Sequence, residues 1–123
     1  MENAKIFLVD DNRDEMWQAE TTLKEAGHEV VLQATDLLGA IKMICEGWLQ
    51  EMGVQIAVLD ANLRRCYVDP LDGAILAHII RSLGLPVKIV SHSSLPKNMG
   101  GFGDEHAQKG DEGENLRNAV AAL

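Results

Sequence analysis

The segment KIFLVDDN, Lys5–Asn12, places a run of apolar residues directly before two adjacent carboxylates. A short, continuous apolar run predicts a strand that is covered on both faces, as in a parallel sheet. Asp10 and Asp11 follow this strand side by side, and their like charges repel each other. An aspartate at the end of a strand can cap the next helix. A cap uses one carboxylate, however, so the second one needs another explanation.

Strand and helix patterns alternate along the rest of the chain. Strands are predicted at 5–9, 29–34, 54–60, 85–91 and 106–109, and helices at 14–26, 37–52, 75–83 and about 112–123. This alternation predicts an α/β fold of the flavodoxin-like type, a doubly wound five-stranded parallel sheet with strand order 2-1-3-4-5. The strand 54–60 is the most apolar and is expected at the centre. Between the fourth and fifth strands, one proline and three glycines predict an irregular or shortened fourth helix.

Length and composition limit the classes of protein to consider. The 123 residues are 46% hydrophobic, which predicts one globular domain, 1–123. Eleven basic and 19 acidic residues give a net charge of −8, which argues against direct nucleic-acid binding. The sequence has no signal peptide pattern and no membrane-spanning run, so we expect a cytoplasmic protein. Cys45 is expected to be a small buried hydrophobe, and Cys66 lies in a polar loop.

Polar residues follow most of the predicted strands at their carboxyl ends. In a parallel sheet these ends share one edge, and ligands bind there, where the strand order reverses. The residues expected at this edge are Asp10, Asp11, Asp60, Asn62, Ser91 and Lys109. Taken singly, each has an ordinary structural explanation, such as a helix cap, a polar strand end or a surface lysine. Their joint occurrence at ordered strand ends favours a binding site.

Three crowded carboxylates indicate a divalent cation. Their mutual repulsion raises at least one pKa unless a positive charge intervenes. Mg²⁺ prefers oxygen ligands and binds through one or two carboxylates plus a phosphate. A carboxylate beside such an ion can also attack phosphorus and form an acyl phosphate. Lys109 then supplies a positive charge and Ser91 a hydroxyl donor for the phosphoryl oxygens.

Five motifs in order carry a resemblance to a known family. They are LVDDN (8–12), VLDANL (58–63), LDG (71–73), KIVSHSS (88–94) and AQK (107–109). Together they resemble the receiver domain of bacterial two-component response regulators, over essentially the whole chain. The resemblance implies that Asp60 is the phosphoacceptor and that Asp10 and Asp11 hold Mg²⁺, Asp11 directly and Asp10 through water. It also implies a metal ligand in the backbone carbonyl of Asn62, a switch hydroxyl in Ser91 and a phosphoryl-pairing ammonium in Lys109.

The family resemblance also implies a function. A histidine kinase or phosphotransfer protein would supply the phosphoryl group to Asp60, and slow hydrolysis would remove it. Such a protein is a signalling switch of a phosphorelay and not an enzyme, apart from its own Mg²⁺-dependent phosphorylation and dephosphorylation. The downstream protein target is not identified by the sequence, and homodimerisation is left open.

The sequence departs from the family pattern in four places. Gly73 follows Asp60 by 13 positions, which implies an insertion around 64–69. Gly110 follows Lys109 where the family usually has a proline, and His106 stands at the position of the aromatic switch residue. The segment between Ser91 and Lys109 is short and rich in glycine. The last three departures leave the family's usual output mechanism open.

Two other functions fit parts of the pattern. A degenerate receiver would act as an interaction module that needs no phosphorylation, and the departures favour this reading. A Mg²⁺-dependent phosphohydrolase with an aspartyl nucleophile is a third candidate. Such enzymes generally have a second carboxylate two residues after the nucleophile, and that position holds Asn62. The phosphohydrolase is therefore the weaker alternative.

Overall fold

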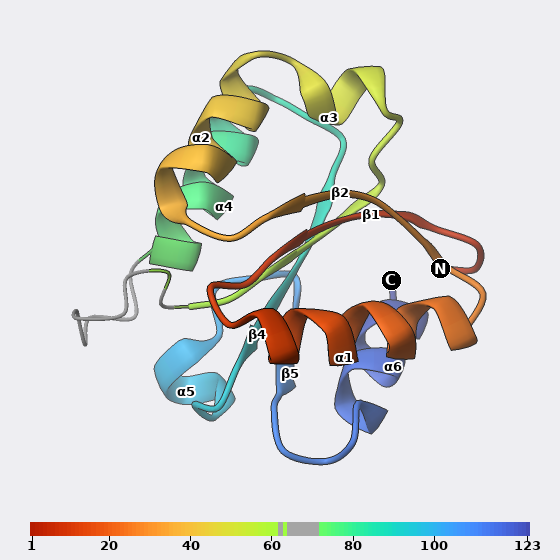
Figure 1. The fold of residues 1–123 in the computed structure, drawn as a ribbon. Helices are drawn as coiled ribbons and strands as arrows, with labels where there is room; N and C mark the ends of the chain where they lie inside the picture. Colours follow the sequence, from red (N-terminus) through yellow and green to blue (C-terminus); the bar gives the residue numbers. More distant parts are fainter. Residues whose placement is uncertain (62, 64–71) are drawn as a thin grey trace.

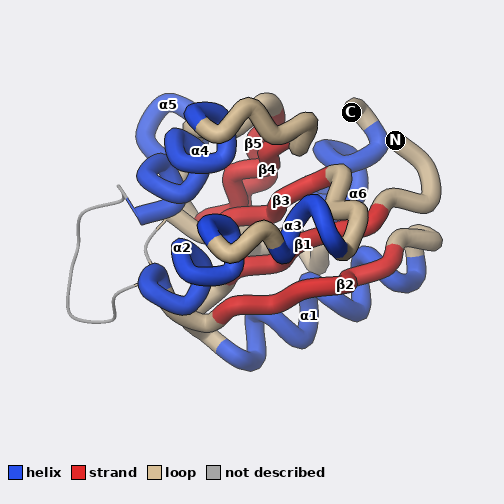
Figure 2. Tube along the Cα trace, turned by 90° about the horizontal axis from the view of Figure 1, so that it is seen from above, coloured by secondary structure: helices blue, strands red, loops and turns tan. Residues whose placement is uncertain are grey.

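The computed structural model describes residues 1–61, 63 and 72–123, which form a twisted five-stranded sheet between two layers of helices (Figure 1). The strand order is β2-β1-β3-β4-β5, and every neighbouring pair is parallel. This is the flavodoxin-like arrangement predicted from the sequence. Figure 2 shows the sheet from above, with helices on both sides of it.

All five strands lie at or near their predicted positions: β1 and β2 have the predicted bounds, whereas the bounds of β3, β4 and β5 differ from the predicted ones by one to three residues. Their bounds are β1 Lys5–Val9, β2 Glu29–Ala34, β3 Ile56–Leu59, β4 Lys88–Ser93 and β5 Glu105–Gln108. β3 occupies the centre of the sheet and all of its residues are buried, as its continuous apolar run indicates. Because Val9 of β1 is level with Leu59 of β3, the residues that follow these two strands emerge next to each other.

Helices cover both faces of the sheet and bury its alternating side chains. Their bounds are α1 Arg13–Glu25, α2 Leu37–Cys45, α3 Trp48–Glu51, α4 Asp72–Ser82, α5 Lys97–Gly100 and α6 Glu114–Ala121. One apolar cluster joins β1, β3 and β4 to α2, α3 and α4, and includes Phe7, Leu59 and Leu76. A second cluster on the opposite face joins the sheet to α1 and α6 (Figure 1).

Asn12 caps the first helix, so the explanation of Asp10 or Asp11 as the helix cap does not hold. The side-chain oxygen of Asn12 accepts hydrogen bonds from the backbone N–H groups of Asp14 and Glu15, at 3.0 and 3.1 Å. Asp10 accepts one from the backbone N–H of Asn12 at 3.0 Å, which holds the turn between β1 and α1. Neither adjacent carboxylate is used as the helix cap.

The predicted helix over 37–52 is wrong in one respect, because the structure divides it into α2 and α3. Gly47 lies between them with φ of 84°, a left-handed conformation that ends the first helix. The prediction that Cys45 is buried is also wrong. Cys45 lies seven residues after Leu38, on the same helical face, and both side chains are exposed to solvent. Cys66 lies outside the described residues.

The segment between β4 and β5 contains α5, a helix of four residues, so the predicted shortened helix is confirmed. Pro96 precedes it and glycines stand at its end, which prevents a longer helix. The two ends of the chain lie close together (Figure 1), and the amino group of Met1 donates to the carbonyl of Val120 at 3.0 Å. Within the part of the chain that the structure describes, no helix combines the length and the apolar character needed to cross a membrane.

Candidate functional site

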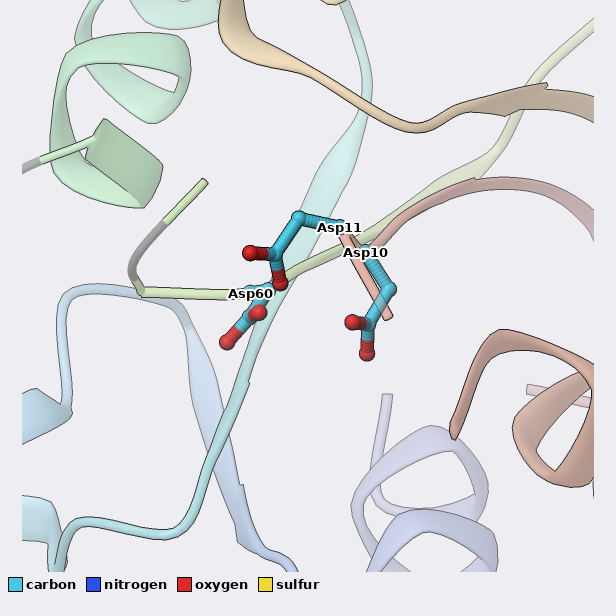
Figure 3. Close-up of side chains that lie close together, drawn as sticks. All are labelled: Asp10, Asp11 and Asp60. Carbon is cyan, nitrogen blue, oxygen red and sulfur yellow. The ribbon is translucent and has the colours of Figure 1, made fainter. Parts of the chain in front are cut away.

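Three carboxylates meet at the carboxyl ends of β1 and β3. Asp10 and Asp11 follow β1, Asp60 follows β3, and these two strands are neighbours in the sheet. One oxygen from each carboxylate lies within 4.8 Å of the others (Figure 3). Asp10 is fully buried and Asp60 is nearly so, whereas Asp11 is half-buried. The sequence prediction that these three residues come together is therefore confirmed.

Lys109 reaches the same cluster from the end of β5. Its Nζ donates to Oδ2 of Asp10 at 2.9 Å and lies 3.6 Å from Oδ1 of Asp60. The lysine side chain is 14% exposed, and those of Asp10 and Asp60 are 1% and 11% exposed. This ion pair is shielded from water, so its Coulombic attraction is less screened than that of a surface pair, and loss of one partner leaves buried charge without compensation. Lys109 lies at the site, as predicted.

Glu15 is a member of the site that the sequence analysis does not identify. Nζ of Lys109 donates to Oε2 of Glu15 at 2.7 Å, and the glutamate side chain is 44% exposed. Glu15 stands in the first turn of α1, three residues after the cap Asn12. A glutamate at this spacing after a cap is a recognisable helix-start signal. It would have placed Glu15 at the sheet edge that receives Asp10 and Asp11.

The charges in the cluster perturb one another. Burial raises the pKa of Asp60 from its usual 3.8 to about 7, and the carboxylates of Asp10 and Asp11 add to this increase while Lys109 opposes it. Burial also raises the pKa of Asp10, again against the effect of Lys109. For Lys109, burial alone would lower the pKa, but the carboxylates of Asp60 and Asp10 outweigh burial and raise it. The lysine therefore stays charged while Asp60 is poorly stabilised as an anion.

The carboxylate cluster fits a hard divalent cation. It offers oxygen ligands from Asp10, Asp11 and Asp60 within 4.8 Å of one another, in a partly buried position. Burial, and after it the charges of Asp10 and Asp11, raises the pKa of Asp60 although Lys109 opposes the increase. A divalent cation would supply the additional positive charge that stabilises the three carboxylates as anions. The predicted ligand Asn62 lies outside the described residues.

Ser91 lies on β4 and is fully buried. The sheet register places it level with Leu59, the residue before Asp60, so it stands at the predicted edge. Its hydroxyl forms a 2.7 Å hydrogen bond with Nδ1 of His106, the residue level with it on β5. His106, singled out at the aromatic switch position, is thus in direct contact with the predicted switch hydroxyl.

Gly73 packs tightly behind the site. It stands in the first turn of α4, and its N–H donates to the carbonyl of Ala61 at 3.1 Å. A Cβ atom at this position would overlap both the backbone oxygen of Asp60 and the ring of Phe102. The glycine therefore allows α4 to begin directly against the backbone of Asp60. The insertion predicted around 64–69 lies outside the described residues.

A pocket of about 460 Å³ adjoins the cluster on the α1 side of the sheet. It opens between α1 and the loop 110–113, and Lys109 and His92 contribute to its lining. His92 is buried, and burial lowers its pKa to about 3, so its imidazole is neutral near neutral pH. Gly110, which follows Lys109, has φ of 110° and turns the chain away from β5 into this loop.

Solved structures match this chain, whereas comparisons of its sequence find no match. The sequence matches no protein-family model and no curated protein. Among solved structures, the chain is similar to the signal receiver domain of the putative response regulator NarL from Mycobacterium tuberculosis. The two share 18% identity with a TM-score of 0.73, over 99% of this chain and 97% of the other.

Two further structures show the same likeness. A two-component response regulator from Clostridium difficile is 22% identical with a TM-score of 0.72, over 97% of this chain and 93% of the other. The response regulator RcsB from Salmonella typhimurium is 17% identical with a TM-score of 0.77, over 100% of this chain and 60% of the other. The chain therefore has the receiver-domain fold, as the sequence motifs predict. At this fold's ligand-binding edge it carries an acidic cluster that can hold a metal ion.

Proposed function

We propose that this protein is a receiver domain, spanning 1–123, that acts as a phosphoacceptor switch in a two-component phosphorelay. A histidine kinase or phosphotransfer protein supplies the phosphoryl group, and Asp60 accepts it with Mg²⁺ bound. The observation that carries the proposal is the cluster of Asp10, Asp11 and Asp60 with Lys109 at the carboxyl ends of the strands. The receiver fold around this cluster supports it.

The chemistry assigns a role to each side chain. A carboxylate oxygen of Asp60 attacks the phosphorus of a phosphohistidine, the P–N bond breaks, and the donor imidazole leaves. Asp10, Asp11 and Asp60, with the carbonyl of Asn62, would hold Mg²⁺, which would supply positive charge beside the transferred group. Hydrolysis by water later breaks the bond between phosphorus and the Asp60 oxygen, and releases inorganic phosphate.

Lys109 and Ser91 act on the phosphoryl oxygens. Lys109 already lies 3.6 Å from the Asp60 carboxylate, so a phosphoryl group on Asp60 competes with Asp10 and Glu15 for its ammonium. The Ser91 hydroxyl is the neutral donor, on the strand beside β3 and level with the residue before Asp60. These contacts stabilise one conformation of the domain more than another. That difference in free energy shifts the equilibrium between the two conformations when Asp60 is phosphorylated.

The proposal also covers the cellular setting. We place the protein in the cytoplasm, with an unidentified protein as downstream target. It acts on itself and turns over no other substrate, so multiple turnovers on a phosphomonoester would favour the phosphohydrolase instead.

The test is phosphorylation by a small-molecule donor. The protein is incubated with acetyl phosphate and Mg²⁺, and intact mass is followed in parallel with Asp60→Asn and with Asp14→Asn. Asp14 is an exposed aspartate in the first turn of α1, so its variant loses the same charge away from the cluster. We expect one phosphoryl group on wild type and on Asp14→Asn, and none on Asp60→Asn. No mass gain in wild type, with beryllofluoride also unbound, would contradict the proposal.

The second candidate is an interaction module that does not use phosphorylation. The four-residue α5 favours it, because the element that follows Ser91 is too short to form a regular helix face. Binding of a partner that survives Asp60→Ala and ignores Mg²⁺ would support this function. Loss of that binding in Asp60→Ala, or its dependence on Mg²⁺, would support the phosphoacceptor switch.

A further inference from the structure

Two short hydrogen bonds connect Ser91, His106 and the backbone of Leu95. The Ser91 hydroxyl lies 2.7 Å from Nδ1 of His106, and Nε2 of the same ring lies 2.8 Å from the carbonyl oxygen of Leu95. Ser91 is fully buried and His106 is half-buried. The imidazole is therefore held at both nitrogens, between the end of β4 and the segment that leads into α5.

The Leu95 carbonyl determines which nitrogen carries the proton in the neutral ring. A carbonyl oxygen can only accept, so Nε2 of His106 must donate to it. The neutral imidazole has one N–H group, and Nδ1 is then a bare acceptor. The Ser91 hydroxyl donates its single proton to Nδ1. While His106 is neutral, that proton is not available for another acceptor.

Protonation of His106 reverses this hydrogen bond. The imidazolium carries N–H groups at both nitrogens, so Nδ1 becomes a donor and the Ser91 oxygen becomes the acceptor. The hydroxyl proton of Ser91 is then free. The backbone oxygen of Glu105, at 3.4 Å, is the remaining acceptor in contact with it and is a weak one at that distance.

We propose that His106 is a positioning residue whose protonation state decides whether the Ser91 hydroxyl can donate to a phosphoryl group on Asp60. The inference rests on the proposed function. A neutral His106 competes with the phosphoryl oxygens for the Ser91 proton, whereas a protonated His106 releases it. Low pH therefore stabilises the phosphorylated form relative to the free form through this one contact.

The surroundings of His106 contain charges of both signs. The titratable and charged groups on the elements packed against β5, and next to His106 along the chain, are Lys88 and His92 on β4, Lys97 on α5, Glu114 and Arg117 on α6, and Asp104, Glu105 and Lys109. His92 adds no charge near neutral pH because burial keeps it neutral. The direct hydrogen-bond partners of the ring are both uncharged, so its own protonation sets the charge at this contact.

The experiment has a part that needs no phosphorylation. Long-range proton–nitrogen NMR correlations of the free protein, at a pH of about 8 where a typical histidine is neutral, identify the protonated nitrogen of His106. We expect the tautomer with hydrogen on Nε2. A hydrogen on Nδ1 would overturn the inference, because Ser91 would then be the acceptor already.

The second part measures beryllofluoride binding, as a stand-in for the phosphoryl group, by fluorine NMR at saturating Mg²⁺. The dissociation constants of wild type and His106→Phe are compared from a pH of about 8 to about 5.5, across the usual pKa of histidine. Phenylalanine keeps an aromatic ring but has no nitrogen that can accept a hydrogen bond from the Ser91 hydroxyl. Titration of Asp60 affects both proteins and cancels in the ratio. We expect the ratio of variant to wild type to rise about fivefold as the pH falls, the effect of one hydrogen bond.

Matched variants separate the possible failures. In a Ser91→Ala background, His106→Phe should leave the pH profile unchanged, because no hydroxyl remains to be positioned. Should His106→Phe fail to fold, His106→Asn serves as the second variant without a titrating ring. Equal pH profiles for wild type and the His106 variant would overturn this inference alone. Absence of beryllofluoride binding at every pH would overturn the proposed function, and the inference with it.

Discussion

The buried carboxylate of Asp60 should destabilise the protein when no cation is bound, and Asp60→Asn should remove that cost. The asparagine side chain has nearly the same size and shape as the aspartate but no charge. It would no longer repel Asp10 and Asp11, and Lys109 would keep its hydrogen bonds to Asp10 and Glu15. We therefore expect the variant to be more stable than wild type without Mg²⁺, although it cannot accept a phosphoryl group.

The magnitude follows from the pKa of Asp60, which is about 7 in the fold against a usual 3.8. The folded protein holds this proton more tightly than the unfolded chain does. Between a pH of about 4 and about 7, the free energy of unfolding should therefore fall as the pH rises. At about 1.4 kcal/mol for each pKa unit, the full cost above this range is about 4 kcal/mol. Asp60→Asn should recover up to that amount.

The assay is urea unfolding of wild type, Asp60→Asn and Asp14→Asn at several pH values, each with and without Mg²⁺. Asp14→Asn makes the same change of charge at an exposed position and should follow wild type. Mg²⁺ should stabilise wild type above a pH of about 7 and stabilise Asp60→Asn less, since the variant has lost one of the three carboxylates that would hold the ion. The reasoning is refuted if Asp60→Asn is no more stable than wild type at high pH without Mg²⁺.

Three other substitutions probe the same region. Lys109→Met leaves buried carboxylates unpaired, so its free energy of unfolding at neutral pH should fall by about 3 kcal/mol, and Mg²⁺ should restore part of it; no loss in urea unfolding would contradict the buried ion pair. Gly73→Ala should cost about 2 kcal/mol in thermal unfolding because its Cβ would meet the Asp60 backbone oxygen, and an unchanged melting temperature would contradict this close contact. His92 has a pKa lowered to about 3, so it contributes stability that is lost as the pH falls below about 6.5. His92→Leu should therefore flatten the acid side of the stability curve, and an unchanged curve would show that His92 is not buried as described.

Much of the fold could be predicted because β1 and β3 are nearly continuous apolar runs and turn residues separate the elements. KIFLV is observed as β1 with the predicted bounds, and Gly27 closes α1 with φ of 91°. The central position of β3 follows from its composition, since a strand without polar residues must be covered on both faces. Five strands alternating with helices then leave few topologies open.

The errors arise where a hydrophobic stripe continues across a break. Residues 37–52 keep an apolar spacing throughout, yet Gly47 ends α2 because its left-handed backbone suits a helix end. Cys45 is exposed because the sheet meets the face of α2 that carries Ala40 and Ile44. A periodic pattern indicates which residues share a face, but the packing of the sheet decides which face is buried.

In the candidate site, too, the sequence predicts which residues are present but not all of the contacts between them. Asp10, Asp11, Asp60, Ser91 and Lys109 could be named from the sequence because each stands at the end of a predicted parallel strand, and such ends share an edge. The contacts of Glu15 with Lys109, and of His106 with Ser91, could not be predicted. They depend on the direction of long side chains and on the strand register.

By itself, the sequence determined the order of strands and helices, the acidic edge and the identity of the groups that gather there, because apolar runs and turn residues act locally. The tertiary structure alone decided how those groups are paired and charged. Burial between two layers of helices removes water from Asp60 and raises its pKa, and the register of β4 and β5 brings a histidine against the Ser91 hydroxyl. Both effects come from solvent exclusion and from distances across the sheet, which no local pattern in the chain encodes.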